Sequence, residues 1–328
     1  MSALRELKIL AFVVVVVGIL YWGVEPLAHS VFHPKTAPAD FAFSDLEKLP
    51  TTGNMENGKV LVNTYCIACH NIEKEGVVNN DVAPSDLIAA YGVLPPDLSN
   101  IGAIYESNFL ANLIKKPTKT LKMTHKFENE KNPMPFPMTP TPVSDAEIGD
   151  MVAYFVSIGD KNLASSVENN KEYTTKLDAI NKSDISEENK KKQALALKYH
   201  IENKEIFISA CTRCHSMKYD NITSSTPSKD IQNYLGAKAP DLSMMIRSKG
   251  EETLSKFIND PQKTLENAAM PRVGLNEYSQ EKVIKYLESI GDSKKEQRIF
   301  VGKILIGFMI IMSIFAYLWK RKIWRDLH

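Results

Sequence analysis

Two short stretches of this chain share one pattern: a pair of cysteines separated by two residues and followed directly by a histidine. They read CIACH from Cys66 to His70 and CTRCH from Cys211 to His215. The C-x-x-C-H pattern is the attachment signature of c-type haem, in which both thiols bond to the porphyrin and the histidine ligates the iron. All four cysteines of the chain lie in these motifs. The sequence therefore predicts two covalently attached haem c groups, bonded to Cys66, Cys69, Cys211 and Cys214 and ligated by His70 and His215.

Two other interpretations of the cysteine pairs are a redox-active dithiol and half of a zinc site. Either would explain a C-x-x-C pair, but neither explains a histidine directly after the second cysteine in both copies. A zinc site with four protein ligands would also have to join motifs that begin at residues 66 and 211. Covalent haem is therefore the preferred interpretation.

The composition limits the other classes of function. The chain has 328 residues, of which 44% are hydrophobic, and its formal net charge is +1. This length suits roughly two globular domains with additional segments. A net charge near zero gives no reason to expect nucleic acid as a partner. The sequence has no glycine-rich phosphate loop that would indicate nucleotide chemistry.

Both end regions are apolar over lengths that can cross a bilayer. Residues 9–24 carry no charge, and residues 299–319 are apolar except for Lys303. A membrane-spanning helix needs about 20 apolar residues. The sequence therefore predicts a membrane anchor near each end. The alternative for the N-terminal stretch is a signal peptide that is cleaved near Ala28 to Ser30.

The charges beside these segments predict their orientation. Arg5 and Lys8 lie near the start of the first segment, and a basic cluster follows the second, formed by Lys320, Arg321, Lys322 and Arg325. Basic residues concentrate on the cytoplasmic side of membrane helices, so both termini are expected in a bacterial cytoplasm. Three basic residues before the second segment count partly against this: Lys294, Lys295 and Arg298. The haem motifs support it, since haem c is attached outside the cytoplasm, and the middle of the chain is expected in the periplasm.

The middle of the chain contains the same module twice. Each copy has a C-x-x-C-H motif, a P-D-L-S segment, a P-x-K-T-L segment, a methionine followed by proline, and a closing S-I-G. So many matches in one order indicate an internal repeat. The closing segments, residues 148–158 and 283–290, have the pattern of amphipathic helices. Ser144 with Asp145 and Ser279 with Gln280 are predicted to cap these two helices.

Each iron is expected to take its second axial ligand from a distant loop, as a thioether or another imidazole. In the second module Met270 is preferred, because Pro271 shapes its loop just before the last helix. In the first module Met134 has the same Met-Pro pattern and is preferred. Met138 is the alternative, because it aligns with Met270 when counted back from the closing S-I-G. The weaker candidates are Met123, His125, Met244, Met245 and His200, the last of which is expected at the surface.

Two prolines follow the motif histidines at nearly equal distances, Pro96 after His70 and Pro240 after His215. Their carbonyl oxygens are the expected acceptors for the Nδ1–H groups of the two imidazoles, which would orient the rings and raise their basicity. A thioether and an imidazole on each iron would leave no open coordination position. This favours electron transfer over oxygen or peroxide chemistry.

Residues 161–198, between the modules, are rich in Asn, Lys, Glu and Ser. They are predicted to form a polar linker or an exposed helix, with helix resuming near Gln193. The predicted layout has seven parts: an N-terminal transmembrane anchor (1–27), a linker (28–50), a first haem module (51–160), the polar segment (161–198), a second haem module (199–292), a C-terminal transmembrane anchor (298–320) and a cytoplasmic tail (321–328).

Each module resembles a class I cytochrome c domain, which has the same order of C-x-x-C-H motif, proline-bearing loop, Met-Pro loop and terminal helix. The resemblance covers roughly residues 51–160 and 199–292. It implies an all-α fold, with two class I cytochrome c domains in tandem between the N- and C-terminal transmembrane helices. It is specific for fold and cofactor but not for biological role.

Residues 319–328 resemble the C-terminal end of bacterial cytochrome c1, where an anchor helix is followed by a basic stretch and a Trp-basic-Asp-aliphatic-His ending. Two haem modules and an N-terminal span depart from the usual cytochrome c1. The chain is therefore similar to the dihaem cytochrome c1 subunits of some bacterial cytochrome bc complexes.

This resemblance implies an electron-transfer subunit, without catalytic residues of its own, in a quinol–cytochrome c reductase of the inner membrane. The implied partners in this dimeric complex are cytochrome b and a Rieske iron–sulfur protein. Electrons would come from the Rieske protein and pass to a periplasmic cytochrome c or a terminal oxidase. The alternative is the dihaem subunit of a cbb3-type oxidase, whose anchors are expected at the N-terminal end.

Overall fold

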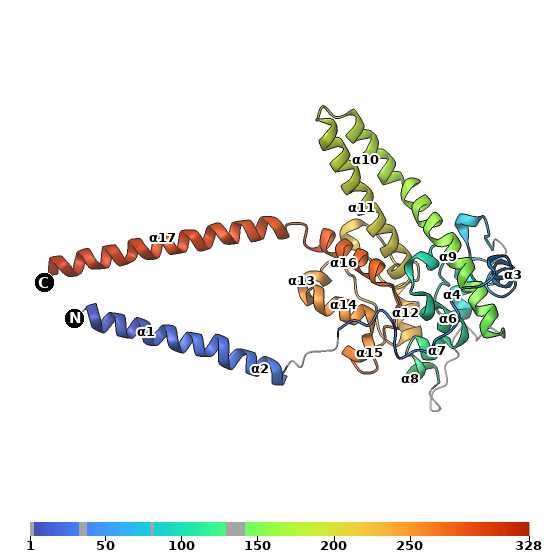
Figure 1. The fold of residues 1–328 in the computed structure, drawn as a ribbon, viewed down its shortest axis with the longest axis horizontal. Helices are drawn as coiled ribbons and strands as arrows, with labels where there is room; N and C mark the ends of the chain where they lie inside the picture. The colour runs from blue at the N-terminus through green and yellow to red at the C-terminus, as the bar shows by residue number, and fades with distance from the viewer. Residues whose placement is uncertain (1–2, 33–37, 80–81, 129–141, 328) are drawn as a thin grey trace. The chain divides into compact units, whose positions relative to one another are not determined.

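The computed structural model describes residues 3–32, 38–79, 82–128 and 142–327 (Figure 1). Within these residues the structure consists of helices and turns, with isolated bridges as the only pairing of extended segments. The predicted all-α fold is confirmed for this part of the chain.

The helices, with 3₁₀ and π turns marked η, are α1 (Ala3–Ile19), η1 (Leu20–Val24), α2 (Glu25–Phe32), α3 (Met55–Tyr65), η2 (Glu73–Glu75), α4 (Pro84–Tyr91), α5 (Ile101–Ile104), α6 (Ser107–Lys115), α7 (Pro117–Thr120), α8 (Thr124–Phe127), α9 (Asp145–Glu168), α10 (Lys171–Lys182), α11 (Glu187–Cys211), η3 (Lys218–Asp220), α12 (Ser228–Leu235), α13 (Met245–Lys249), α14 (Glu251–Asn259), α15 (Pro261–Thr264), α16 (Glu277–Gly291) and α17 (Lys295–Leu327).

The chain divides into two compact units, Met1–Ala39 and Asp40–His328. In the first unit, α1, η1 and α2 follow one another without a break. The second unit contains both of the repeated modules. The modules therefore pack against each other within one unit, and their division into two cytochrome c domains stays a prediction.

In the first module, α9 packs along α3, α5 and α6. The predicted cap of α9 is confirmed, because the N–H of Glu147 donates to the Ser144 hydroxyl and the Glu147 carboxylate accepts from the N–H of Ser144. The inner face of α9 buries Met151 and Phe155 in a hydrophobic core with Val62 of α3. This core positions α3, which leads directly into the first haem motif.

The crossing of α3 and α9 is close at Gly58. A Cβ atom at this position would lie 2.0 Å from the carbonyl oxygen of Asp150 and 3.0 Å from Cβ of Tyr154. No side chain can be added there unless the two helices separate. The backbones can approach this closely because residue 58 is glycine.

In the second module, α16 packs against α11, α13 and α14. Phe207 of α11 and Tyr286 of α16 are fully buried, with ring centroids 4.8 Å apart. The predicted cap of this last helix at Ser279 and Gln280 is wrong. The helix starts earlier, because the side chain of Asn276 accepts a hydrogen bond from the N–H of Ser279 and so caps the first turn.

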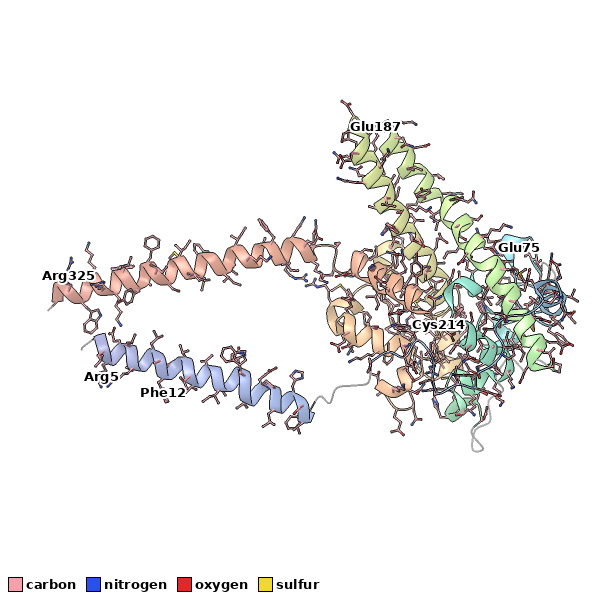
Figure 2. The ribbon with its side chains drawn as sticks, viewed as in Figure 1. Arg5, Phe12, Glu75, Glu187, Cys214 and Arg325 are labelled. Atoms are coloured by element: carbon pink, nitrogen blue, oxygen red, sulfur yellow. The ribbon has the colours of Figure 1, made fainter. Side chains whose placement is uncertain are left out.

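Between the modules the chain forms a helical hairpin, in which α10 packs against α11. Glu187, labelled in Figure 2, lies at the tip of the hairpin. α11 begins at this residue, earlier than the predicted start near Gln193, because Ser186 caps the helix. Lys204 of α11 donates to Glu172 of α10 at 2.8 Å. This ion pair links the two helices of a polar hairpin that has little apolar surface to bury.

The two modules share an interface. Tyr105 of the first module and Leu275 of the second form an isolated bridge. Beside it, the N–H of Asn276 donates to the carbonyl of Ile104 at 3.0 Å. Ile104 is fully buried and lies in the hydrophobic core of the second module, together with Leu275. Burial of apolar side chains from both modules in one core joins them firmly.

Four charged side chains, called here the charge cluster, connect three parts of the second unit. Asp45 comes from the segment before the first module, Lys122 from the first module, and Asp260 and Arg272 from the second. The guanidinium of the fully buried Arg272 donates to both carboxylate oxygens of Asp45, at 3.0 and 2.7 Å. Asp260 lies 3.5 Å from Arg272 and accepts from Lys122. Arg272 and Asp260 are both buried, so removal of one partner would leave a buried charge with weaker compensation, and the cluster therefore resists displacement.

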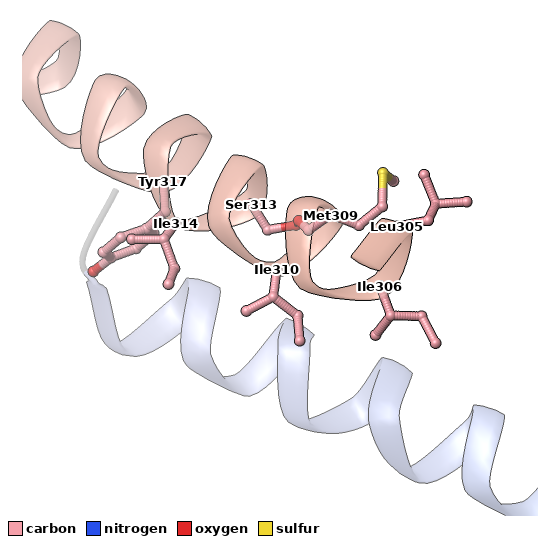
Figure 3. Close-up of a pocket in the computed structure, with 7 residues that line it drawn as sticks. All are labelled: Leu305, Ile306, Met309, Ile310, Ser313, Ile314 and Tyr317. Carbon is pink, nitrogen blue, oxygen red and sulfur yellow. The ribbon is translucent and has the colours of Figure 1, made fainter. Parts of the chain in front are cut away.

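The two apolar end regions form long helices. The stretches Leu4–Phe32 and Lys295–Arg325 are long and apolar enough to cross a membrane, and the most apolar window of each is not buried. Figure 3 shows one side of α17, formed by Leu305, Ile306, Met309, Ile310, Ser313, Ile314 and Tyr317. Apolar surface of this extent is unfavourable in water and suits a lipid environment.

Replacing Gly58 by Ala is expected to destabilise the first module by about 1–3 kcal/mol, because the added methyl group forces α3 and α9 apart. Thermal unfolding followed by circular dichroism measures the change. Lys59→Ala, an exposed neighbour on α3, is the matched control and should leave the melting temperature nearly unchanged. Equal melting temperatures for Gly58→Ala and the wild type would contradict the close helix crossing.

The charge cluster makes stability depend on acidity. Burial raises the pKa of Asp45, but hydrogen bonds from Arg272 and the charges of Arg272 and Lys122 outweigh it and lower the pKa to about 2. An aspartate with a folded pKa below its unfolded value of about 3.9 stabilises the fold above that value and loses this effect as the pH falls. Urea unfolding should therefore show the wild type more stable than Asp45→Asn at about pH 6, with the difference shrinking between about pH 4 and about pH 2.

Asp178→Asn, on the exposed side of α10, controls for the loss of one negative charge. A stability difference between the wild type and Asp45→Asn that stays constant over this pH range would show that the carboxylate charge of Asp45 does not stabilise the fold.

Candidate haem-binding sites

The first haem motif lies at the C-terminal end of α3. Cys66 caps the helix, with its N–H donating to the carbonyl of Val62 at 2.9 Å. The N–H groups of Cys69 and His70 both donate to the carbonyl of Cys66, at 3.2 and 3.0 Å. The motif is therefore a tight turn. Such a turn keeps both thiols and the imidazole close enough to serve a single porphyrin.

A backbone carbonyl sets the protonation of the motif histidine. Nδ1 of His70 lies 2.8 Å from the carbonyl oxygen of Pro96. A carbonyl can only accept, so the proton is on Nδ1 and the lone pair of Nε2 is left for a metal. Burial is the main cause that lowers the pKa of His70, so the ring is neutral near pH 7. Neutral imidazole is the form that ligates iron.

The loop that carries Pro96 is held against the haem motif by Asp97 and Ser99. The carboxylate of Asp97 accepts from the N–H groups of Glu73 and Ser99, both at 2.9 Å. The hydroxyl of Ser99 accepts from the N–H of Lys74 at 3.1 Å. Asp97 and Ser99 were not predicted as site residues, although the recurrence of P-D-L-S in both modules is a signal that points to them.

The second motif has the same surroundings as the first. Nδ1 of His215 lies 2.8 Å from the carbonyl oxygen of Pro240, and burial lowers the pKa of His215. The carboxylate of Asp241 accepts from the N–H groups of Lys218 and Ser243, at 3.0 and 3.1 Å. The internal repeat in the sequence is thus also a repeat of contacts around the histidine.

The four cysteines are partly buried, and no disulfide joins them. Burial raises the pKa of Cys66 to about 11 and that of Cys211 to about 12. Within the described residues, no three His, Cys, Asp or Glu side chains are grouped so that they could hold a metal ion.

The candidate thioether ligand of the second module lies between α15 and α16. Met270 is half-buried in residues 265–276, defined here as the methionine loop. Its carbonyl accepts a hydrogen bond from Nε2 of Gln262 at 3.3 Å. Met134 and Met138, the candidates of the first module, both lie outside the described residues.

The weaker candidates occupy other places. Met123 is fully buried in a small apolar cluster, which is a packing role. His125 lies on α8, while Met244 directly precedes α13 and Met245 opens it. His200, expected at the surface, is half-buried. Its ring packs against a tyrosine ring of α16, with 6.0 Å between the centroids.

Hydrogen bonds connect the surroundings of the two motifs. The N–H of Leu94, in the loop that leads to Pro96, donates to the hydroxyl of Thr226 at 3.1 Å. The N–H of Thr226 donates in turn to the carbonyl of Arg213, inside the second motif, at 3.2 Å. The proline loop of the first module therefore lies directly against the segment that follows the second haem motif.

Comparison with known proteins identifies the first module. The family described as "Cytochrome c" matches residues 55–159. A solved chain titled "Hyperthermophilic respiratory Complex III" is 22% identical, with a TM-score of 0.31, over 40% of this chain and 77% of that chain. This TM-score is too low to support a conclusion about the fold. No curated protein matches. The chain contains a cytochrome c domain, which implies covalently attached haem c and an electron-transfer role.

Proposed function

We propose that this chain is a membrane-anchored dihaem cytochrome c that serves as the cytochrome c1 subunit of a quinol–cytochrome c reductase. The repetition of the haem surroundings carries the proposal. The first module matches the cytochrome c family, and its histidine–carbonyl contact of 2.8 Å recurs in the second module, at His70 and His215. A module with the same motif and the same contacts is expected to hold the same cofactor.

The residues of both modules fit haem c. When bound, each haem would supply an iron that alternates between two oxidation states. In each module two thiols would form the covalent attachment, and the motif histidine would ligate the iron. The proline carbonyl holds the imidazole in one orientation and raises the basicity of Nε2. The proposed attachment and ligand residues are Cys66, Cys69 and His70 in the first module, and Cys211, Cys214 and His215 in the second.

A methionine thioether is the proposed second protein ligand of each iron. Met270 would serve in the second module, and Met134, with Met138 as the alternative, in the first. A thioether opposite an imidazole raises the reduction potential and stabilises the ferrous form. With both ligands bound, the iron would have no open position for oxygen or peroxide. The expected chemistry is the transfer of single electrons.

Electrons are expected to pass between the two haems within the chain. The hydrogen bonds from Leu94 to Thr226 and from Thr226 to Arg213 join the surroundings of the two sites. Two sites in such contact support a relay inside one body.

The long apolar helices are the proposed anchors. The run from α1 to α2, together with α17, would cross the inner membrane and keep the haem modules at its periplasmic surface. Arg5 and Lys8 before the first span, and the basic cluster after residue 319, support cytoplasmic ends for both spans. Anchoring would keep the irons close to membrane-bound electron donors.

The assignment to a reductase rests on residues 319–328, which resemble the end of cytochrome c1, and on the order of haem module and C-terminal anchor. Cytochrome b and a Rieske protein would be the partners, and a periplasmic cytochrome c or terminal oxidase the acceptor. The N-terminal run of α1 to α2 favours a second candidate, the dihaem subunit of a cbb3-type oxidase. A second anchor at α17, which is long and apolar enough to cross a membrane, would favour the reductase.

Purification of the tagged chain from its native membrane in mild detergent separates these two functions. We expect a b-type cytochrome and a Rieske iron–sulfur protein to remain bound, with a mock purification from untagged cells as the control. Recovery with a copper–haem oxidase and without a Rieske protein would contradict the reductase and support the oxidase.

Met270→Ala is expected to lower the reduction potential of one haem and to remove about half of the long-wavelength absorption of ferric methionine-ligated haem, because one of two thioether ligands is lost. Redox titration followed by visible spectroscopy measures both. Met245→Ala, on α13, is the matched control and should change neither. Met134→Ala, and not Met138→Ala, is expected to lower the potential of the first haem. An unchanged titration in Met270→Ala would show that this residue is not a ligand.

A further inference from the structure

We propose that the first module and the segment before it hold the methionine loop of the second module, and that Asp45 and Arg272 are positioning residues for Met270. This inference rests on the proposed function, in which Met270 ligates the second iron. In addition, residues outside the second module would control the position of its methionine ligand.

The backbone of the methionine loop is fastened to the first module. Four hydrogen bonds make this connection: Arg272 N–H to the Leu121 carbonyl (3.1 Å), Glu106 N–H to the Gly274 carbonyl (3.0 Å), Asn276 N–H to the Ile104 carbonyl (3.0 Å) and Asn276 Nδ2 to the Ala103 carbonyl (2.7 Å). Within the second module, Gln262 binds the carbonyls of Ala268 and Met270 near the start of the loop. The part of the loop after Met270 therefore follows a path given by the first module.

Gly274 allows the loop to approach the first module closely. Its φ is +81°, a conformation that L side chains rarely adopt. A Cβ atom at this position would lie 2.1 Å from ring atoms of Phe109, which is fully buried on α6. The ring of Phe109 thus defines one side of the space that the loop occupies.

The side chain of Arg272 provides the strongest attachment. It follows Met270 by two residues, with the φ of Pro271 fixed between them. Both of its terminal nitrogens bind the carboxylate of Asp45, and its guanidinium carbon lies 4.8 Å from the ring centroid of Phe43. A planar guanidinium with two parallel hydrogen bonds and an aromatic ring beside it has a defined position and orientation.

The segment that carries Asp45 is itself held on both sides. Before it, Asp40 exchanges two hydrogen bonds with the side chain of Asn259 in the second module, at 2.9 and 3.2 Å. After it, the N–H of Leu49 donates to the side chain of Asn108 in the first module, at 3.0 Å. Asp45 is thus a fixed point for Arg272, because both modules determine where its segment runs.

A bond between iron and a thioether depends on the position of the sulfur, and displacements of about 1 Å impair sites of this kind. Loss of the Asp45 carboxylate would leave the buried charge of Arg272 without its main partner. The methionine loop would then relax away from its present path and draw Met270 with it. The Asp45–Arg272 pair should therefore favour the methionine-ligated form of the second site.

Asp45→Asn and Arg272→Lys in the full-length chain test this inference. Haem content, the potential of each haem and the long-wavelength absorption of methionine-ligated ferric haem are measured, and Met270→Ala identifies which potential belongs to the second haem. We expect unchanged haem content, a lower potential at that haem, a loss of up to half of the absorption, and no change at the other haem. Asp178→Asn is the charge-matched control and should match the wild type.

The inference is wrong if both variants melt at lower temperature while both potentials and the absorption stay at wild-type values, since the pair would then serve folding alone. If Asp45→Asn does not accumulate, Arg272→Lys gives the same test, because it keeps the positive charge and loses the paired geometry. If Met270→Ala itself leaves both potentials unchanged, the proposed ligand is wrong and the inference fails with it. If Met270→Ala changes a potential but Asp45→Asn and Arg272→Lys do not, the inference is wrong while the proposed ligand stands.

Discussion

The hydrogen bond between each motif histidine and a proline carbonyl is the contact on which both candidate sites depend. It fixes the proton on Nδ1, leaves Nε2 for a metal, and prevents rotation of the ring. Asp97 and Asp241 then fasten each proline loop to the segment that follows its motif. A short motif thus becomes a site with one orientation of the imidazole, because a loop more than twenty residues further along is held in place around it.

The packing of the two modules against each other also constrains the arrangement of the two candidate sites. Ile104 of the first module is buried in the core of the second, and the charge cluster spans both modules and the segment before them. Two separately folded domains on a polar linker would sample many relative orientations. A shared core removes that freedom, so the relation between the two sites is a property of the fold. For a relay of single electrons, this means that the separation of the two irons would stay constant from one transfer to the next.

Those parts of the fold and site that depend on local sequence could be predicted. The helical periodicity, the Ser144 cap, the two apolar end helices and the repeat of C-x-x-C-H, P-D-L-S and S-I-G are all visible within short windows. The hairpin of α10 and α11 was predicted only as a linker or exposed helix, because its polar composition hides the ion pairs between Glu172 and Lys204. The cap at Asn276 was not predicted, because Ser279, three residues further along, fits the same pattern. The pairing of Asp45 with Arg272 joins positions far apart in the chain, and no local pattern reports it.

The central claim is that both modules of this single chain carry haem c. The intact mass of the chain, purified from its native membrane and then denatured, tests it most directly, since covalent haem survives denaturation. The account predicts a mass equal to that of the polypeptide plus two haem groups, with one haem on the peptide containing Cys66 and Cys69 and one on the peptide containing Cys211 and Cys214. A mass that corresponds to one haem or none would contradict it.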